Sequence, residues 1–197
     1  MSLLLASASP TRASLLREAG VPFEVRPARV DEDSVKDSLL AEGAQPRDIA
    51  DALAELKALR VSASNPGALV LGADQVIGFG SELVSKSSSL TEAAALLRRM
   101  CGKSILLVTA AVLAKDSRPI WRHVDRIALT MRVFSEDFLT EYLAQEGETV
   151  LGCVGAFRVE GPGLQLFERI EGDYFSILGL PMLPLLTALR EQGIIPK

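Results

Sequence analysis

Short apolar runs alternate with helical patterns along the whole chain, and this alternation restricts the fold more than any other feature of the sequence. The runs typical of strands or extended chain lie at 3–6, 23–29, 69–79, 105–115, 120–133, 157–160, 164–170 and 174–177. The helical patterns lie at 9–20, 47–62, 90–99, 135–145 and 181–192. Interleaved strands and helices predict an α/β fold, with connections too irregular for a plain doubly wound sheet.

Composition narrows the class of protein. The 197 residues contain no fixed-period repeat, low-complexity run or long linker, so we expect a single domain over residues 1–197. With 48% hydrophobic residues the chain can fill a substantial core, and its longest apolar stretch, 105–114, is too short to cross a bilayer core of about 30 Å. A formal charge of −4 gives no general attraction to nucleic acid, so any bound anion needs a local site.

The opening segment and the rare residues exclude further classes. Residues 1–10 lack the basic start of a secretory signal, so we expect a retained segment and a cytoplasmic protein. Cys101 and Cys153 lie far apart in a chain large enough to fold without disulfides, which favours reduced thiols. With His123 as the one histidine, zinc sites with paired Cys/His ligands and Ser-His-Asp triads are disfavoured.

The segment Ser7-Ala-Ser9-Pro10-Thr11-Arg12 leads from a predicted strand directly into a helix. Ser9 is placed to cap that helix and Pro10 to occupy its first position. Free backbone N–H groups at the helix start, with the forked cation of Arg12, would form a cradle for phosphate. An ordinary capped helix with a surface arginine explains the same residues, and the segment alone leaves both interpretations open.

Asp74 and Gln75 interrupt the apolar run 69–79. Burying an unpaired carboxylate costs on the order of several kcal/mol, so Asp74 must be paired, bind a metal or face a cleft. A catalytic carboxylate and a buried aspartate that accepts from loop amides remain alternatives. Lys57 falls at the edge of the inward stripe of helix 47–62, where its ammonium either reaches a cleft or snorkels to solvent, as Arg60 also can.

Two weaker signals complete the set of candidates. Lys86 lies in the polar stretch 85–89, and Glu32 lies between two aspartates, in settings that solvated loops also provide. Acidic ligands for a hard divalent cation, cations for phosphate oxygens and a helix start are together the parts of phosphoryl-transfer chemistry. The sequence has no P-loop, no strand-linked G-x-G-x-x-G and no G-x-S-x-G elbow, which excludes those sites.

An ordered set of short motifs runs along nearly the full length of the chain. Its members are 5–12 (LASASPTR), 30–32, 54–58, 72–74, Lys86, Gly102 with Thr109, 153–157, 160–161, 166–172 and 179–181. This ordered set resembles the Maf-like nucleotide pyrophosphatases. The resemblance implies a two-lobed Maf/inosine-triphosphatase-like α/β fold, with a central mixed sheet and a cleft between the lobes, and frequently a homodimer.

The resemblance also implies a chemistry and a role for each candidate residue. The reaction is hydrolysis of a nucleoside triphosphate to the monophosphate and pyrophosphate, with Mg²⁺ or Mn²⁺ as cofactor and neither nucleic acid nor membrane as partner. Asp74 is the proton acceptor for the attacking water, with Lys57 and Lys86 in the catalytic site beside it. Ser7, Ser9 and Arg12 bind the triphosphate, and Glu32 and Asp74 place the metal.

Three positions are associated in the family with the choice of base: Thr11, Gln75 and Glu160. Gln75 and Glu160 resemble the 7-methyl-GTP branch, and a carboxylate suits the cationic 7-methylguanine. Thr11 departs from that branch, where a bulky Trp is expected, as do Ser87 and Ala110, which replace a usual proline and glycine. On the match of Gln75 and Glu160 we expect hydrolysis of 7-methyl-GTP or a related modified nucleotide. The alternatives are dTTP or UTP hydrolysis and a non-catalytic nucleotide-binding regulator of cell division.

Overall fold

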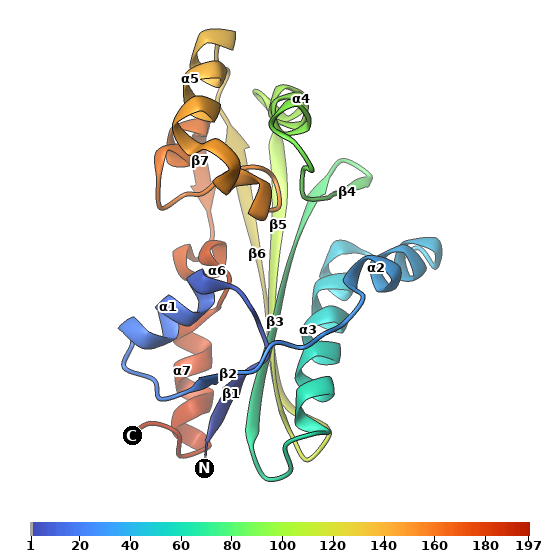
Figure 1. The fold of residues 1–197 in the computed structure, drawn as a ribbon, viewed down its shortest axis with the longest axis vertical. Coiled ribbons are helices and arrows are strands. Elements are labelled where there is room, and N and C mark those ends of the chain that lie inside the picture. Colours follow the sequence, from blue (N-terminus) through green and yellow to red (C-terminus); the bar gives the residue numbers. More distant parts are fainter. Residues whose placement is uncertain (1) are drawn as a thin grey trace. The chain divides into compact units, whose positions relative to one another are not determined.

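The computed structural model describes residues 2–197, in which seven strands form one mixed sheet (Figure 1). The strands are β1 (Leu3–Leu5), β2 (Glu24–Val25), β3 (Leu69–Phe79), β4 (Glu82–Val84), β5 (Ser104–Lys115), β6 (Arg118–Met131) and β7 (Phe167–Glu171). Their order is β2-β1-β3-β5-β6-β7, with β4 paired to β3. Strand β1 pairs in parallel with β2 and β3, whereas β6 pairs antiparallel with β7. The predicted α/β class with a central mixed sheet is confirmed.

The helices alternate with these strands along the chain. They are α1 (Pro10–Glu18), α2 (Glu32–Ala41), α3 (Pro46–Ser62), α4 (Leu90–Met100), α5 (Glu136–Glu146), α6 (Tyr174–Leu178) and α7 (Met182–Glu191), with 3₁₀ turns η1 (Gly147–Gly152) and η2 (Pro162–Leu166). The chain divides into two compact units. The first comprises Met1–Gln75, Val108–Asp125 and Asp173–Lys197, and the second comprises Val76–Leu107 and Arg126–Gly172.

In the first unit, the two faces of the sheet pack against different helices (Figure 1). Side chains alternate along a strand, so Leu69, Leu71 and Ala73 of β3 join the core formed with α1 and α7. Val70 points to the other face, where it packs with Val61 of α3. Residues 72 and 74 share that second face, so the acidic position of β3 is directed toward α3.

Gly72 sets a close approach between β3 and α3. A Cβ atom at this position would lie 2.1 Å from the carbonyl oxygen of Ala54 and 2.6 Å from the amide nitrogen of Ala58, so the contact requires a residue without a side chain. Lys57 lies between these positions on the helix, and Asp74 follows two residues after Gly72 on the same face of the strand. The contact therefore places Lys57 next to Asp74.

In the second unit, α4 and α5 contact each other and η1. Both helices begin at a serine cap, since the side chains of Ser89 and Ser135 each accept a bond from a backbone N–H in the first turn. Helix α4 buries Ala93, Leu97 and Met100, whose spacing of three to four residues forms one apolar stripe.

The predicted hairpin 105–133 is confirmed, and its turn has an unusual backbone. Asp116 and Ser117 form the two-residue connection between β5 and β6, and both have positive φ, at 50° and 60°. Positive φ at both central residues is the conformation that matches the twist of a two-residue hairpin.

Two predicted strands were wrong, and helix α2 was not predicted. The predicted strand 164–170 begins only at Phe167, because residues 164–166 belong to the 3₁₀ turn η2. Residues 174–177 form α6, because Asp173 caps its start and Gly179 ends it in the left-handed conformation. Residues 157–160 form irregular chain and a turn. Helix α2 buries none of its side chains, so it has no apolar stripe that a sequence pattern could reveal.

The cysteines and the lengths of the helices bear on two expectations from composition. Cys101 and Cys153 are free cysteines, as predicted. Within residues 2–197, every helix is too short or too polar to cross a membrane. The single-domain boundary, the cleft, the homodimer and the cytoplasmic location stay predictions.

Candidate functional site

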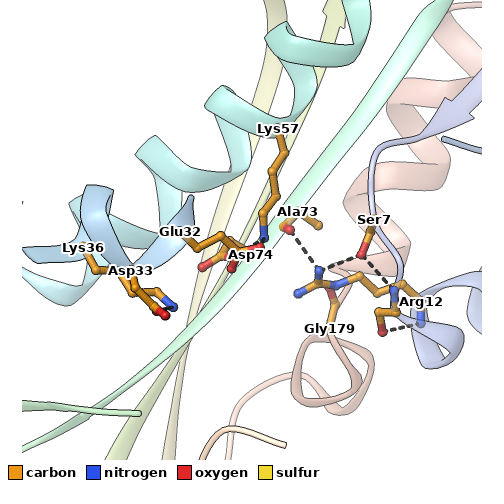
Figure 2. A network of polar contacts seen from close by, with 10 residues as sticks. Ser7, Arg12, Glu32, Asp33, Lys36, Lys57, Ala73, Asp74 and Gly179 are labelled. Atoms are coloured by element: carbon orange, nitrogen blue, oxygen red, sulfur yellow. Dashed lines mark hydrogen bonds and ion pairs between the residues drawn. The ribbon is translucent and has the colours of Figure 1, made fainter. Parts of the chain in front are cut away.

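Three side chains from three elements meet at one ammonium group (Figure 2). The Nζ atom of Lys57 on α3 lies 2.7 Å from Oδ1 of Asp74 on β3 and 2.8 Å from Oε1 of Glu32 at the start of α2. Lys57 is 6% exposed and Asp74 is 4% exposed. Lys57 therefore extends inward to a buried carboxylate instead of snorkelling to solvent, and Asp74 meets the cost of burial by pairing.

The second carboxylate oxygen of Asp74 is a buried acceptor without a hydrogen-bond partner among residues 2–197. Buried polar atoms are bonded in the large majority of cases, because an unsatisfied one costs about 1–3 kcal/mol. Lys57 restrains the carboxylate through the other oxygen. The result is an oriented acceptor suited to a water proton or to a cation.

The start of α1 is capped as the sequence predicts, and its arginine is buried. The Oγ atom of Ser9 accepts from the backbone N–H of Arg12 at 3.3 Å, and Pro10 occupies the first helical position. Arg12 is only 8% exposed, which rules out the surface arginine of the simpler interpretation. Its side chain is directed toward Ala73 in the middle of β3 (Figure 2).

Three acceptors hold the guanidinium of Arg12. Its Nε atom donates to the carbonyl of Gly179 at 3.0 Å, and Nη1 donates to Oγ of Ser7 at 3.1 Å and to the carbonyl of Ala73 at 2.9 Å. Arg12 has five N–H donors, and Nη2 has no hydrogen-bond partner within residues 2–197. One edge of an immobilised guanidinium thus remains available to an anion.

The charges of these groups act on one another. Burial lowers the pKa of the Arg12 guanidinium, while the negative charges of Asp74 and Glu32 raise it. The two carboxylates therefore lie close enough to stabilise the cationic form of Arg12. Two carboxylates and two cations form one electrostatic cluster.

Glu32 and Asp74 are the residues expected to place a divalent cation. Across residues 2–197, no three His, Cys, Asp or Glu side chains gather into a metal-binding group, so the candidate ligand set is these two carboxylates. Mg²⁺ is commonly held by one or two carboxylates, with waters and substrate phosphates as its other ligands. The unpartnered Oδ2 of Asp74 next to Glu32 fits that mode of binding.

The remaining predicted residues make none of the contacts described above. Gln75 points to the opposite face of β3 from Asp74, where its Nε2 atom contacts Thr109 Oγ1 at 2.9 Å. Thr11 is half-buried in the first turn of α1. Lys86 and Glu160 are exposed and belong to the second unit, so their roles stay predictions.

Sequence reasoning missed the two backbone carbonyls, of Ala73 and Gly179, that hold Arg12. A carbonyl group is present at every position, so residue type gives no direct sign of it. Gly179 offers an indirect sign, since a glycine after a short element indicates a helix end. The fold and these side chains together define an α/β protein with a buried carboxylate–lysine pair and a held arginine whose Nη2 donors can bind an anion.

Comparison with known proteins identifies the family. A family model described as "Maf-like protein" matches residues 2–192. A nucleoside triphosphate pyrophosphatase of Granulibacter bethesdensis is 53% identical, with 98% of each chain covered. A 7-methyl-GTP pyrophosphatase of Rhizobium meliloti is 50% identical, with 98% of this chain and 97% of the relative covered. A protein of the same name from Brucella suis is 46% identical, with 99% of this chain and 98% of the relative covered. The chain belongs to the Maf-like protein family, which confirms the resemblance drawn from its motifs.

Proposed function

We propose that this protein hydrolyses nucleoside triphosphates to the monophosphate and pyrophosphate, with 7-methyl-GTP as its preferred substrate. Membership of the family and the names of the relatives confirm the expected enzyme class, a nucleoside triphosphate pyrophosphatase. The observation that carries the mechanism is the unpartnered Oδ2 atom of Asp74.

Asp74 acts as the general base for the attacking water. Lys57 holds Oδ1 at 2.7 Å and so fixes the rotation of the carboxylate, which leaves Oδ2 as the proton acceptor. Attack on the α-phosphoryl group requires a water in line with the leaving pyrophosphate, and a positioned base contributes typically about 10²–10⁴-fold to the rate.

Arg12 and Lys57 bind the triphosphate oxygens. The two N–H groups of Nη2 on Arg12 can each donate to a phosphate oxygen, and the other donors of this side chain keep it in place. An ammonium has three N–H donors, of which Asp74 and Glu32 engage two on Lys57, so a third is left for a phosphate oxygen. Both cations stabilise the charge that spreads over the phosphoryl oxygens during transfer.

Glu32 would bind a Mg²⁺ or Mn²⁺ ion directly, and the negative charge of Asp74 would help to hold the ion there while Oδ2 accepts the proton of the attacking water. When bound, such an ion neutralises charge on the phosphates and on the departing pyrophosphate. Glu32 is suited to this role because it is more exposed than Asp74 and already lies beside the Lys57 ammonium.

The preference for 7-methyl-GTP rests on Glu160 and on the names of two relatives. The 7-methylated guanine ring carries a positive charge, which the exposed carboxylate of Glu160 would stabilise more than an amide would. Thr11 is smaller than the residue expected in that branch, so we expect measurable turnover of other purine triphosphates as well.

The test is pyrophosphate release from 7-methyl-GTP, GTP, dTTP and UTP, with Mg²⁺ or Mn²⁺, by the wild type, Asp74→Asn and the matched control Asp33→Asn. Asp33 is an exposed carboxylate one residue from Glu32, and it pairs with Lys36 (Figure 2). We expect 7-methyl-GTP to have the highest kcat/KM, Asp74→Asn to lose activity and Asp33→Asn to keep it.

Three outcomes would contradict the proposal. Undiminished turnover by Asp74→Asn would remove Asp74 as the base. Preference for dTTP or UTP would overturn the assigned substrate while leaving the enzyme class intact. Tight nucleotide binding without pyrophosphate release from any substrate would favour a regulatory binding protein.

A further inference from the structure

Gln75 and Thr109 fasten the end of α6 to the sheet. The Nε2 atom of Gln75 lies 2.9 Å from Oγ1 of Thr109, 2.9 Å from the carbonyl of Ser176 and 3.0 Å from the carbonyl of Ile177. The hydroxyl of Thr109 donates to the same Ser176 carbonyl at 2.6 Å. Thr109 and Ser176 are fully buried. Two side chains from β3 and β5 thus bond to carbonyl groups in the last turn of α6, where the Ser176 carbonyl also accepts from the backbone N–H of Gly179 at 3.2 Å.

Ser176 is also held through its own side chain. Its Oγ atom donates to Oδ2 of Asp125 on β6 at 2.5 Å. Helix α6 has only five residues, too few to be stable through its own hydrogen bonds. Its position therefore depends on these contacts with three strands of the sheet.

Helix α6 ends next to Gly179, whose carbonyl binds the guanidinium of Arg12. Gly179 follows α6 with φ of 116°, and its carbonyl accepts from Nε of Arg12 at 3.0 Å. A Cβ atom on Gly179 would lie 3.0 Å from that same Nε and 3.3 Å from Oε1 of Gln75. Gly179 is thus packed between the two side chains, and a shift of α6 would move the carbonyl that orients the guanidinium.

We infer that Gln75 and Thr109 are positioning residues: by fixing α6 and the Gly179 carbonyl, they direct the Nη2 edge of Arg12 toward a polyphosphate. The inference rests on the proposed function only in taking Arg12 as the polyphosphate ligand. Neither residue needs to touch the substrate. Their contribution passes through one hydrogen bond to a charged donor, a class of bond about twice as strong as a neutral one.

This role differs from that of a residue that reads the base. An amide nitrogen carries two hydrogens, and three acceptors of the protein itself surround Nε2 of Gln75. A positioning residue changes the affinity for every triphosphate by the same factor, because all of them share the polyphosphate. A residue that reads the base changes the ratio between substrates.

The test measures binding of inorganic tripolyphosphate by calorimetry, in variants whose thermal unfolding shows that they are folded. Thr109→Val removes the hydroxyl at nearly constant volume, and Thr109→Ser restores it. Thr187→Val is the matched control, since Thr187 is an exposed threonine of α7 that bonds within its own helix. Gln75→Met removes the amide donors, and it tests the same link should Thr109→Val fail to fold.

We expect Thr109→Val and Gln75→Met to weaken tripolyphosphate binding about tenfold, the loss that corresponds to one charge-assisted hydrogen bond. Thr109→Ser and Thr187→Val should bind like the wild type. In the hydrolysis assay, kcat/KM should fall by a common factor for all triphosphates.

Binding by Thr109→Val and Gln75→Met within twofold of the wild type would overturn the inference, as would a changed ratio between substrates at unchanged tripolyphosphate affinity. A loss in Thr109→Ser equal to that in Thr109→Val would also overturn it. Wild-type protein that binds tripolyphosphate but hydrolyses no nucleotide would contradict the proposed function, and the comparison of variants would still decide the positioning role.

Discussion

Replacement of Lys57 by methionine removes the ammonium that pairs with Asp74 while keeping a side chain of similar length. Asp74 is 4% exposed, and its Oδ2 atom already has no hydrogen-bond partner within residues 2–197, so the substitution leaves both oxygens of a buried carboxylate without a hydrogen-bonded cation. Removing one partner of a buried ion pair costs about 3–5 kcal/mol. In a chain of this length, about 3 kcal/mol corresponds to a lowering of Tm by roughly 6–12 °C.

The assay is urea unfolding followed by circular dichroism and by Trp121 fluorescence. The matched control is Lys36→Met, because Lys36 pairs with the exposed Asp33 at 3.8 Å and should contribute less than about 1 kcal/mol. The double variant Lys57→Met/Asp74→Leu removes the unpaired charge, so it should recover most of the lost stability. A Lys57→Met protein within about 1 kcal/mol of the wild type, or a double variant less stable than Lys57→Met, would refute the assigned buried pair.

Three further predictions concern the fold and one thiol. Gly72→Ala should lower the free energy of unfolding by about 3 kcal/mol, because the new Cβ atom meets the α3 backbone. The control Gly152→Ala adds its methyl group to open space and should change that free energy by less than about 0.5 kcal/mol. Equal losses for the two variants in urea unfolding would argue against the close contact. Ser117→Gly should raise the same free energy by about 0.5 kcal/mol, because φ is 60° there, and a decrease would count against the described turn. Burial, and next the charge of Glu160, raise the pKa of the Cys153 thiol, so alkylation of Cys153 in Cys101→Ser protein should accelerate at a higher pH than alkylation of a free cysteine peptide; half-maximal rate at or below the peptide's pH would contradict this.

Much of the sheet could be predicted because its strands carry their own signal. The run 69–79 is continuously apolar apart from Asp74 and Gln75, and it forms β3 with the predicted bounds. Asp74 could be identified as a candidate because burying a carboxylate inside such a run is unfavourable unless the carboxylate has a partner. The alternating pattern of β3 then decides which face each of the two polar residues takes.

Other parts of the site depend on tertiary contacts that no local pattern contains. The helical wheel placed Lys57 at the edge of the buried stripe, and its inward direction follows from the approach of α3 to Gly72. The sequence of α6 is aromatic and β-branched, which is typical of a strand, but the cap at Asp173 and the bonds from Gln75 and Thr109 stabilise a helix instead. The holders of Arg12 could not be predicted because two of them are backbone carbonyls.

The central claim is that Oδ2 of Asp74 accepts the proton of the attacking water, and a single-turnover measurement on Asp74→Asn tests it most directly. The amide of asparagine keeps an oxygen for the Lys57 ammonium, and it removes the second acceptor together with the negative charge. We predict that hydrolysis of saturating 7-methyl-GTP slows by about 10²–10⁴-fold, while the Kd for the nucleotide changes little. A single-turnover rate within about tenfold of the wild type, at unchanged affinity, would contradict the account.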